Sequence, residues 1–179
     1  MAKSTIIFLY LLLLPFLCYS SDANSLRKCA VTCAQDEIGI QELTGNNDGV
    51  RVEQYLRHVG LPKGYPWCAA AMSFILDLCG VDNPRSPYCP DWFKEKYLVY
   101  KRNSEKDDFD VSKPGDMIGI WFSSKSRIAH IGMIESTEGA TVTTLEGNTT
   151  DFDYSRDGQG FYRKYRLKNQ IYAVSSFYK

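Results

Sequence analysis

The chain has 179 residues, of which 44% are hydrophobic and 13% aromatic, and these values are typical of one globular domain with its own core. Its 21 lysines and arginines balance its 21 aspartates and glutamates, so the net charge does not favour nucleic acid or another polyanion as a partner. A basic cluster near the C-terminus (Arg163, Lys164, Arg166 and Lys168) alternates with apolar residues. This alternation predicts the solvated face of a strand.

The N-terminus has the pattern of a secretory signal peptide. A short basic start is followed by an apolar run from Thr5 to Leu17 and then by small and polar residues. The run is short for a membrane-spanning helix, which needs about 20 residues. The small residues before each position allow cleavage after Ser20 or after Ala23. We expect residues 1–23 to be the signal peptide and residues 24–179 to form a mature domain, secreted or in the periplasm or cell envelope, with no membrane span after signal removal.

The first half of the mature chain has helical patterns. We predict helices at residues 27–38 and at residues 52–59, where apolar residues recur at helical spacing. Residues 67–79 are apolar almost throughout, which predicts a buried central helix. A shorter helix is expected near residues 91–98, followed by a charged, solvated loop at residues 101–110.

The second half of the chain has the pattern of short strands. β-Branched and aromatic residues fill five segments that Gly, Asp, Asn and Ser separate: residues 115–122, 130–136, 141–148, 161–167 and 171–178. Helices followed by strands favour an α+β domain in which N-terminal helices pack on a C-terminal antiparallel sheet.

An odd number of cysteines is left once Cys18 departs with the signal peptide: Cys29, Cys33, Cys68, Cys79 and Cys89. In an exported protein this predicts one free thiol. Cys68 and Cys79 lie too far apart along one helix to form a disulfide. Cys79 and Cys89 are a reasonable pair across the loop between them, whereas Cys29 and Cys33 are an awkward pair within one helix. Four cysteines allow three connectivities, and these alternatives stay open.

Cys68 is the candidate nucleophile, because a thiol in the first turn of a helix has a lowered pKa. The alternative is a small core residue. Of the two histidines, His58 lies off the apolar stripe of its helix and is interpreted as a surface residue. His130 opens a predicted strand, and Glu146 and Asn148, two residues apart on the next strand, are expected to point to one side. These groups form a possible set of nucleophile, base and orienting residues.

Four motifs occur in order along the chain: Pro66-Trp67-Cys68-Ala69-Ala70, Lys113-Pro114-Gly115-Asp116, His130-Ile131-Gly132 and Glu146-Gly147-Asn148-Thr149. Together they resemble the CHAP family of cysteine, histidine-dependent amidohydrolases and peptidases, relatives of NlpC-type and papain-like proteases. The resemblance covers most of the mature chain. It implies a papain-like or NlpC-like fold and cleavage of amide bonds in bacterial peptidoglycan, as a muramoyl-alanine amidase or a peptide endopeptidase. Ala71 departs from the bulky aromatic residue of many members, which would alter packing beneath the groove.

The resemblance also implies a role for each candidate residue. Cys68 would attack the amide carbonyl, His130 would transfer protons and Glu146 would orient the imidazole. Asn148 would help to orient that group or polarise the oxyanion, although a residue that ends the strand is an alternative. Trp67 would line the substrate groove, whereas Trp92 and Trp121 are expected in the core. No cofactor and no metal are predicted, because the oxygen-bearing residues at 42–48 lack a full calcium-ligand pattern.

Two classes of function follow. The first is an exported, monomeric thiol hydrolase that acts on the peptide or glycan of the cell wall, without nucleic acid; no inhibitory partner is evident. The second is a non-catalytic module on the same fold that binds the cell wall or a protein. An amidase that acts on an amide outside the wall is a variant of the first class.

Overall fold

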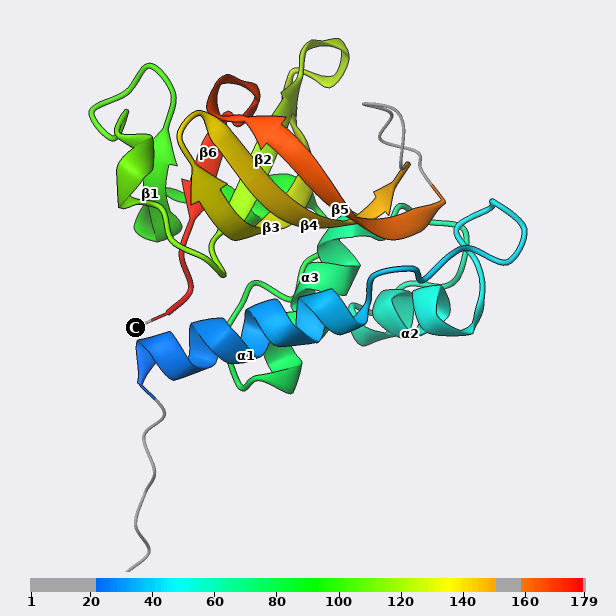
Figure 1. The fold of residues 1–179 in the computed structure, drawn as a ribbon. Helices are drawn as coiled ribbons and strands as arrows, with labels where there is room; N and C mark the ends of the chain where they lie inside the picture. The colour runs from blue at the N-terminus through cyan, green and yellow to red at the C-terminus, as the bar shows by residue number, and fades with distance from the viewer. Residues whose placement is uncertain (1–21, 151–158, 179) are drawn as a thin grey trace, which may run out of the picture.

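Three α-helices pack against a six-stranded antiparallel sheet within the described part of the chain (Figure 1). The computed structural model describes residues 22–150 and 159–178. The predicted signal peptide, apart from its last two residues, lies outside these ranges. The structure confirms the α+β class and the packing of N-terminal helices on an antiparallel sheet.

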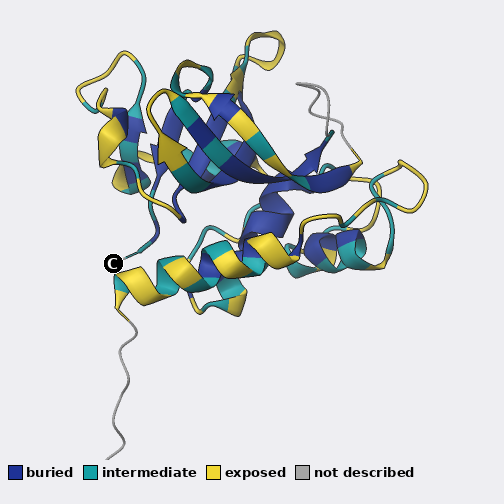
Figure 2. Cartoon of the chain, viewed as in Figure 1, coloured by how far each residue is buried: buried dark blue, intermediate teal, exposed yellow. Residues whose placement is uncertain are grey.

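The three helices are α1 (Ala23–Asp36), α2 (Val50–His58) and α3 (Cys68–Leu78). Their positions agree with the predicted helices to within a few residues. The side chain of Asp22 caps α1 by accepting a hydrogen bond from the Ser25 N–H at 2.8 Å. Most of α3 is buried, as its apolar composition predicts, and it runs between the other helices and the sheet (Figure 2).

The sheet contains β1 (Leu98–Lys101), β2 (Met117–Phe122), β3 (Arg127–Glu138), β4 (Thr141–Thr149), β5 (Gly160–Leu167) and β6 (Ala173–Ser175). Its spatial order is β1-β6-β2-β3-β4-β5, so the last strand of the chain lies between β1 and β2. The meander from β2 to β5 pairs neighbours in sequence. This meander carries His130 and Glu146 on adjacent strands.

The segment before β2 differs from its prediction. Instead of a helix at residues 91–98, two short 3-10 turns, η1 (Cys89–Phe93) and η2 (Glu95–Tyr97), lead into β1. Lys94 has extended backbone and separates the turns. The expected solvated loop at residues 101–110 begins in β1 and runs into a 3-10 turn at Phe109–Val111, where the Phe109 ring is buried. The structure of this segment depends on its pairing with β6 and on the burial of Tyr100 and Phe109, and such long-range contacts leave no local sequence pattern.

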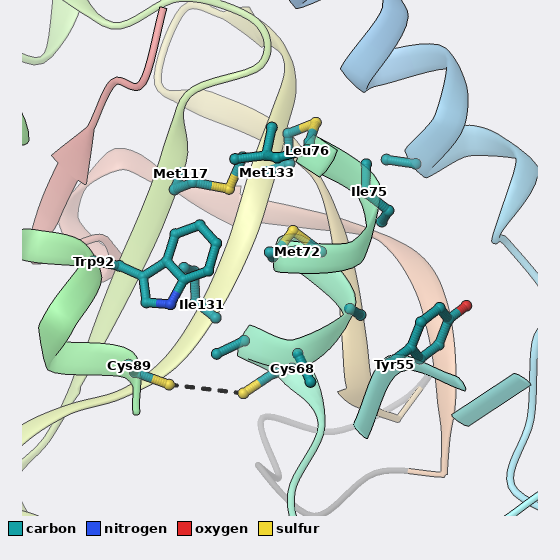
Figure 3. Packing of buried hydrophobic residues seen from close by; sticks show 14 of the residues in the cluster. Tyr55, Cys68, Met72, Ile75, Leu76, Cys89, Trp92, Met117, Ile131 and Met133 are labelled. Atoms are coloured by element: carbon teal, nitrogen blue, oxygen red, sulfur yellow. Dashed lines mark hydrogen bonds between the residues drawn. The ribbon is translucent and has the colours of Figure 1, made fainter. Parts of the chain in front are cut away.

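Two apolar clusters hold the layers together. The larger one surrounds α3 and includes Met72 and Leu76 from the helix, Met117 and Met133 from the sheet, and Trp92 from η1 (Figure 3). The smaller cluster collects residues of five strands, one residue of the 3-10 turn η3 (Phe109–Val111) and one residue just before β6: Tyr100, Phe109, Ile118, Ile134, Val142, Ile171 and Val174. Because these side chains are almost entirely removed from water, they supply the main driving force for folding.

The Lys113-Pro114-Gly115-Asp116 motif joins α1 to the start of β2. Gly115 has φ +91°, a backbone conformation that favours glycine. The Arg27 guanidinium donates to the buried Asp116 carboxylate at 2.7 Å and to the Pro114 carbonyl at 3.0 Å. The motif therefore positions a helix on the sheet, and its acidic group is already paired.

A disulfide joins Cys29 in α1 to Cys79 at the end of α3. The suggested pairing of Cys79 with Cys89 is therefore wrong, because packing of two helices brings together cysteines 50 residues apart. Cys33, Cys68 and Cys89 keep their thiols, so the described residues contain three thiols where one was predicted. Cys89 lies instead beside the N-terminal end of α3.

Candidate active site

Cys68 is the first residue of α3 and therefore lies in the first turn of the helix, as the sequence predicts. The helix begins with the Ala71 N–H donating to the Trp67 carbonyl at 2.9 Å, which leaves the N–H groups of the first turn directed out of the helix end. Cys68 is only 3% exposed, and the three alanines after it are fully buried. Small side chains let this end of the helix pack closely beneath the strands.

His130 and Glu146 come together from β3 and β4. The imidazole Nε2 lies 2.8 Å from the Glu146 Oε2 atom, and both side chains are buried. The paired part of the two strands stops at Met133 and Leu145, and beyond this point the Glu146 side chain lies across Gly132. A Cβ atom on Gly132 would lie 2.5 Å from the Glu146 Cγ atom. The glycine two residues after His130 is therefore required for this contact.

Arg166 on β5 is a member of the site that sequence reasoning missed. Its guanidinium binds both carboxylate oxygens of Glu146, with the Nε atom 2.5 Å from Oε1, and Thr144 also donates to Oε1 at 2.5 Å. Arg166 is buried, whereas the alternation of its strand predicted a solvated position. A buried carboxylate needs a cationic partner, and this requirement could have pointed to one of the basic residues of β5.

Glu146 is held as a carboxylate. Burial opposes its ionisation, but hydrogen bonds from Arg166 and His130 together with their positive charges keep its pKa well below the usual range of a glutamate. A carboxylate fixed in this way orients the His130 ring and stabilises its protonated form.

His130 is held as an imidazolium near neutral pH. Burial lowers its pKa, but Cys68 and Glu146 outweigh burial and raise the pKa to about 9. Nε2 is directed at Glu146, which leaves the other ring nitrogen without this carboxylate as a partner. That atom, Nδ1, is buried and makes no hydrogen bond with the described residues.

The pKa of the Cys68 thiol is lowered by its surroundings. Its pKa lies well below the ordinary value of a thiol, first because of the neighbouring Cys89 thiol and then because of His130 and the Ile131 N–H, although burial opposes this shift. The two sulfur atoms lie 3.7 Å apart and face each other, Cys68 from α3 and Cys89 from the turn that carries Trp92 (Figure 3). The lowered pKa of Cys68 and the raised pKa of His130 together favour a thiolate–imidazolium pair.

Asn148 lies near the cysteine but takes part in a different set of contacts. Its side-chain Oδ1 accepts the Trp67 N–H at 3.0 Å, and its Nδ2 donates to Asn47 at 3.1 Å. The strand pairing shifts after Glu146, and Asn148 has φ +56°, so the two side chains do not share one side as predicted. Asn148 fixes the residue before Cys68 and does not orient the imidazole.

Trp67 does not line a groove as predicted. Its ring is fully buried, stacks on Tyr55 at 5.5 Å between centroids and donates from Nε1 to Glu42 at 2.8 Å. A Cβ atom on Gly147 would lie 2.6 Å from this ring, so the glycine after Glu146 makes room for it. Trp67 is a core residue that supports the start of α3.

An aromatic pocket of about 210 Å³ lies between η1 and the strands. Trp121, which is 42% exposed and was expected in the core, lines it together with Tyr172, and their ring centroids are 4.9 Å apart. Pro90, directly after Cys89, and Ile128, two residues before His130, also line it. Trp92 is fully buried, as predicted.

The remaining polar candidates are paired elsewhere. His58 is half-buried and lies 2.7 Å from the Asp77 carboxylate, so it is a structural residue of α2. The sulfur atoms of Cys29, Cys33 and Cys79 lie within 4.8 Å of one another, a spacing that suits a metal, but two of them form the disulfide. In the loop at residues 42–48, Glu42 and Asp48 accept hydrogen bonds from Trp67, Asn47 and Thr44.

Comparison with known proteins finds no match: no family model, curated protein or solved structure matches the chain. Among the described residues, no helix has the length and apolar composition needed to cross a bilayer.

Proposed function

We propose that the protein is an exported cysteine hydrolase, with a papain-like or NlpC-like fold, that cleaves amide bonds in bacterial peptidoglycan. One observation carries the proposal: a thiol at the first turn of a buried helix lies beside an imidazole whose far nitrogen is bound to a buried carboxylate. A structural core needs no such set of ionised groups, because burying them opposes folding.

In the proposed first step, the Cys68 thiolate attacks the carbonyl carbon of the amide. The C–N bond breaks as the His130 imidazolium gives its Nδ1 proton to the leaving nitrogen, so an amine departs and a thioester remains. Glu146 keeps the ring in place during the transfer, and Arg166 keeps Glu146 in place. The N–H groups at the start of α3 would stabilise the negative charge on the carbonyl oxygen.

In the second step, water attacks the thioester. Neutral His130 removes a proton from this water, the carbon–sulfur bond breaks, and the products are a carboxylic acid and the Cys68 thiolate beside a restored imidazolium. Each group returns to its starting state, so no cofactor is consumed. The exposed ring of Trp121 and the half-buried ring of Tyr172 offer apolar faces on which a sugar ring or a peptide of the wall could bind.

The test is digestion of purified peptidoglycan sacculi by the secreted form of the protein, by Cys68→Ala and by Cys33→Ala. We expect fragments from the wild type and from Cys33→Ala, which removes a thiol outside the site, and none from Cys68→Ala. Fragment masses separate amidase from endopeptidase cleavage. Digestion by Cys68→Ala would exclude this proposal. So would the absence of released fragments with all three proteins on several wall types under reducing conditions.

A second candidate, a non-catalytic binding module, is favoured by one observation: Cys68 and His130 are each only 3% exposed. A substrate carbonyl reaches the sulfur only if side chains above it move aside. Alkylation by iodoacetamide at pH 6 separates the two functions. An accessible thiolate reacts at this pH, whereas an ordinary thiol is almost wholly protonated and a permanently enclosed sulfur does not react.

A further inference from the structure

We propose that Cys68 and Cys89 form a reversible disulfide, which switches the nucleophile off until a thiol reductant opens the bond. The regulatory consequence rests on the proposed function, whereas formation of the bond does not. Both residues keep their thiols, both side chains are buried, and their sulfur atoms lie 3.7 Å apart. Figure 3 shows the two side chains pointing toward each other from α3 and η1.

The geometry requires only a small movement. A disulfide bond is about 2.05 Å long, so the sulfur atoms would have to approach by about 1.7 Å from their present separation. Asn148 and the large apolar core hold the start of α3. Cys89 belongs to the same core, but it opens a 3-10 turn after residues 81–88, which form no helix or strand. The movement is therefore expected from η1.

The chemistry is a thiol–disulfide exchange with a low-molecular-weight disulfide as the oxidant. The Cys68 thiolate attacks one sulfur of the oxidant, whose S–S bond breaks and releases one thiolate. The Cys89 thiol then loses its proton to a base and attacks the Cys68 sulfur, which releases the second thiolate of the oxidant. The protein loses two hydrogen atoms and the oxidant gains them, so an excess of reduced thiol reverses the reaction.

Cys33 is the natural comparison, because it is also a thiol 3.7 Å from another sulfur, that of Cys79. Its partner is already bonded to Cys29, so exchange at this site only changes which cysteines are linked. Burial and the nearby acidic side chains also raise the pKa of Cys33, which makes it a slow attacking group at neutral pH. The low-pKa thiol with a thiol neighbour is Cys68.

The experiment equilibrates the secreted protein in mixtures of oxidised and reduced glutathione, blocks the remaining thiols with iodoacetamide and maps disulfide-linked peptides by mass spectrometry. Wild type, Cys89→Ser and Cys33→Ser are compared. We expect a Cys68–Cys89 linked peptide in wild type and in Cys33→Ser. In both proteins, digestion of sacculi should fall in proportion to the linked fraction and recover fully with dithiothreitol. Cys89→Ser should instead carry glutathione on Cys68 and form no internal bond there.

The proposal is overturned if oxidised wild type yields no Cys68–Cys89 peptide, or if Cys68 keeps glutathione as persistently in wild type as in Cys89→Ser. It is also overturned if digestion stays unchanged while the bond forms. A reduced protein that digests no sacculi but forms and opens the bond with the glutathione ratio would disprove the proposed function. The disulfide itself would stand.

Discussion

At the scale of single residues, the Glu146 carboxylate pairs with two cationic side chains. Glu146 binds the His130 imidazole and the Arg166 guanidinium, and the three side chains are almost completely removed from water. In this environment a negative charge acts strongly on its neighbours, because little water screens it. The acid–base behaviour of the site should therefore depend on Glu146 more than on any group at the surface.

The first prediction concerns the pH dependence of kcat/KM on a soluble peptidoglycan fragment. Activity should fall above pH 9, where His130 loses the proton that it donates to the leaving amine, because the pKa of His130 is about 9. The acidic limb should lie below the ordinary pKa of a thiol, about 8.5, because the pKa of Cys68 is lowered. In Glu146→Gln the basic limb should move from about 9 toward the ordinary histidine value of about 6.5.

Glu146→Gln should also reduce kcat by about 100-fold or more, because the imidazolium loses its counter-charge and its orientation. The same change leaves Arg166 buried without its acid. The double variant Glu146→Gln with Arg166→Met removes that charge too and serves as the folded comparison. Glu135→Gln is the control, since Glu135 pairs with the exposed Arg163. A basic limb that stays at pH 9 in both site variants would show that Glu146 does not act on His130.

The second prediction distinguishes positioning by Asn148 from participation in proton transfer. Asn148→Ala leaves the Trp67 N–H without its acceptor, which should reduce the free energy of unfolding by about 1–3 kcal/mol and lower kcat. Both limbs of the pH profile should stay in place, because the site's titrating groups remain. Asn148→Gly loses the same side chain but tolerates φ +56°, so it should unfold less easily than the alanine variant. A shifted limb in either variant would place Asn148 in the acid–base chemistry.

At the scale of elements, close approach between β3 and β4 depends on Gly132. In Gly132→Ala the new methyl group would lie 2.5 Å from the Glu146 Cγ atom and 3.1 Å from the Leu145 carbonyl oxygen. We expect loss of most activity and a decrease of about 1–3 kcal/mol in the free energy of unfolding, measured by urea denaturation. Gly119→Ala, which meets the Phe93 ring instead, is the matched control and should keep the pH profile. Full activity in Gly132→Ala would contradict the observed contact.

The disulfide between α1 and α3 should stabilise the packing of these helices. It joins residues 50 apart, and chain-entropy arguments give about 4 kcal/mol for a loop of this length. The double variant Cys29→Ser with Cys79→Ser should lose an amount of this order in thermal or urea unfolding. Cys29→Ser alone should lose less, because Cys33 lies 3.7 Å from Cys79 and can replace Cys29 as its partner. Equal losses in the single and double variants would exclude this replacement.

At the scale of the whole molecule, the buried acid links stability to pH. The pKa of Glu146 is below the usual range in the folded protein and about 4.3 in an unfolded chain. Its contribution is complete above the unfolded pKa and decreases as the pH falls toward the folded pKa. The free energy of unfolding should therefore drop below about pH 4 in wild type. The variant Glu146→Gln with Arg166→Met should show a smaller drop, and an equal drop would assign acid sensitivity to other groups.

The sequence by itself determined the order of the three α-helices and of strands β2 to β6, the place of Cys68 in the first turn of α3, and the candidates Cys68, His130 and Glu146. These features follow from local periodicity and from residue types whose chemistry needs no tertiary context. The short strand β1 lacked such a pattern, because its pairing with β6 joins segments far apart in sequence.

Only the tertiary structure decided which groups surround the candidates. Whether Arg166 faces water or Glu146, whether Cys79 bonds Cys29 or Cys89, and whether Trp67 lines a groove or the core depend on how distant elements pack. Alternation along β5 makes its two faces different but does not say which face meets a buried carboxylate. Burial and pairing are properties of the packed chain, and the contacts that create them join residues tens of positions apart.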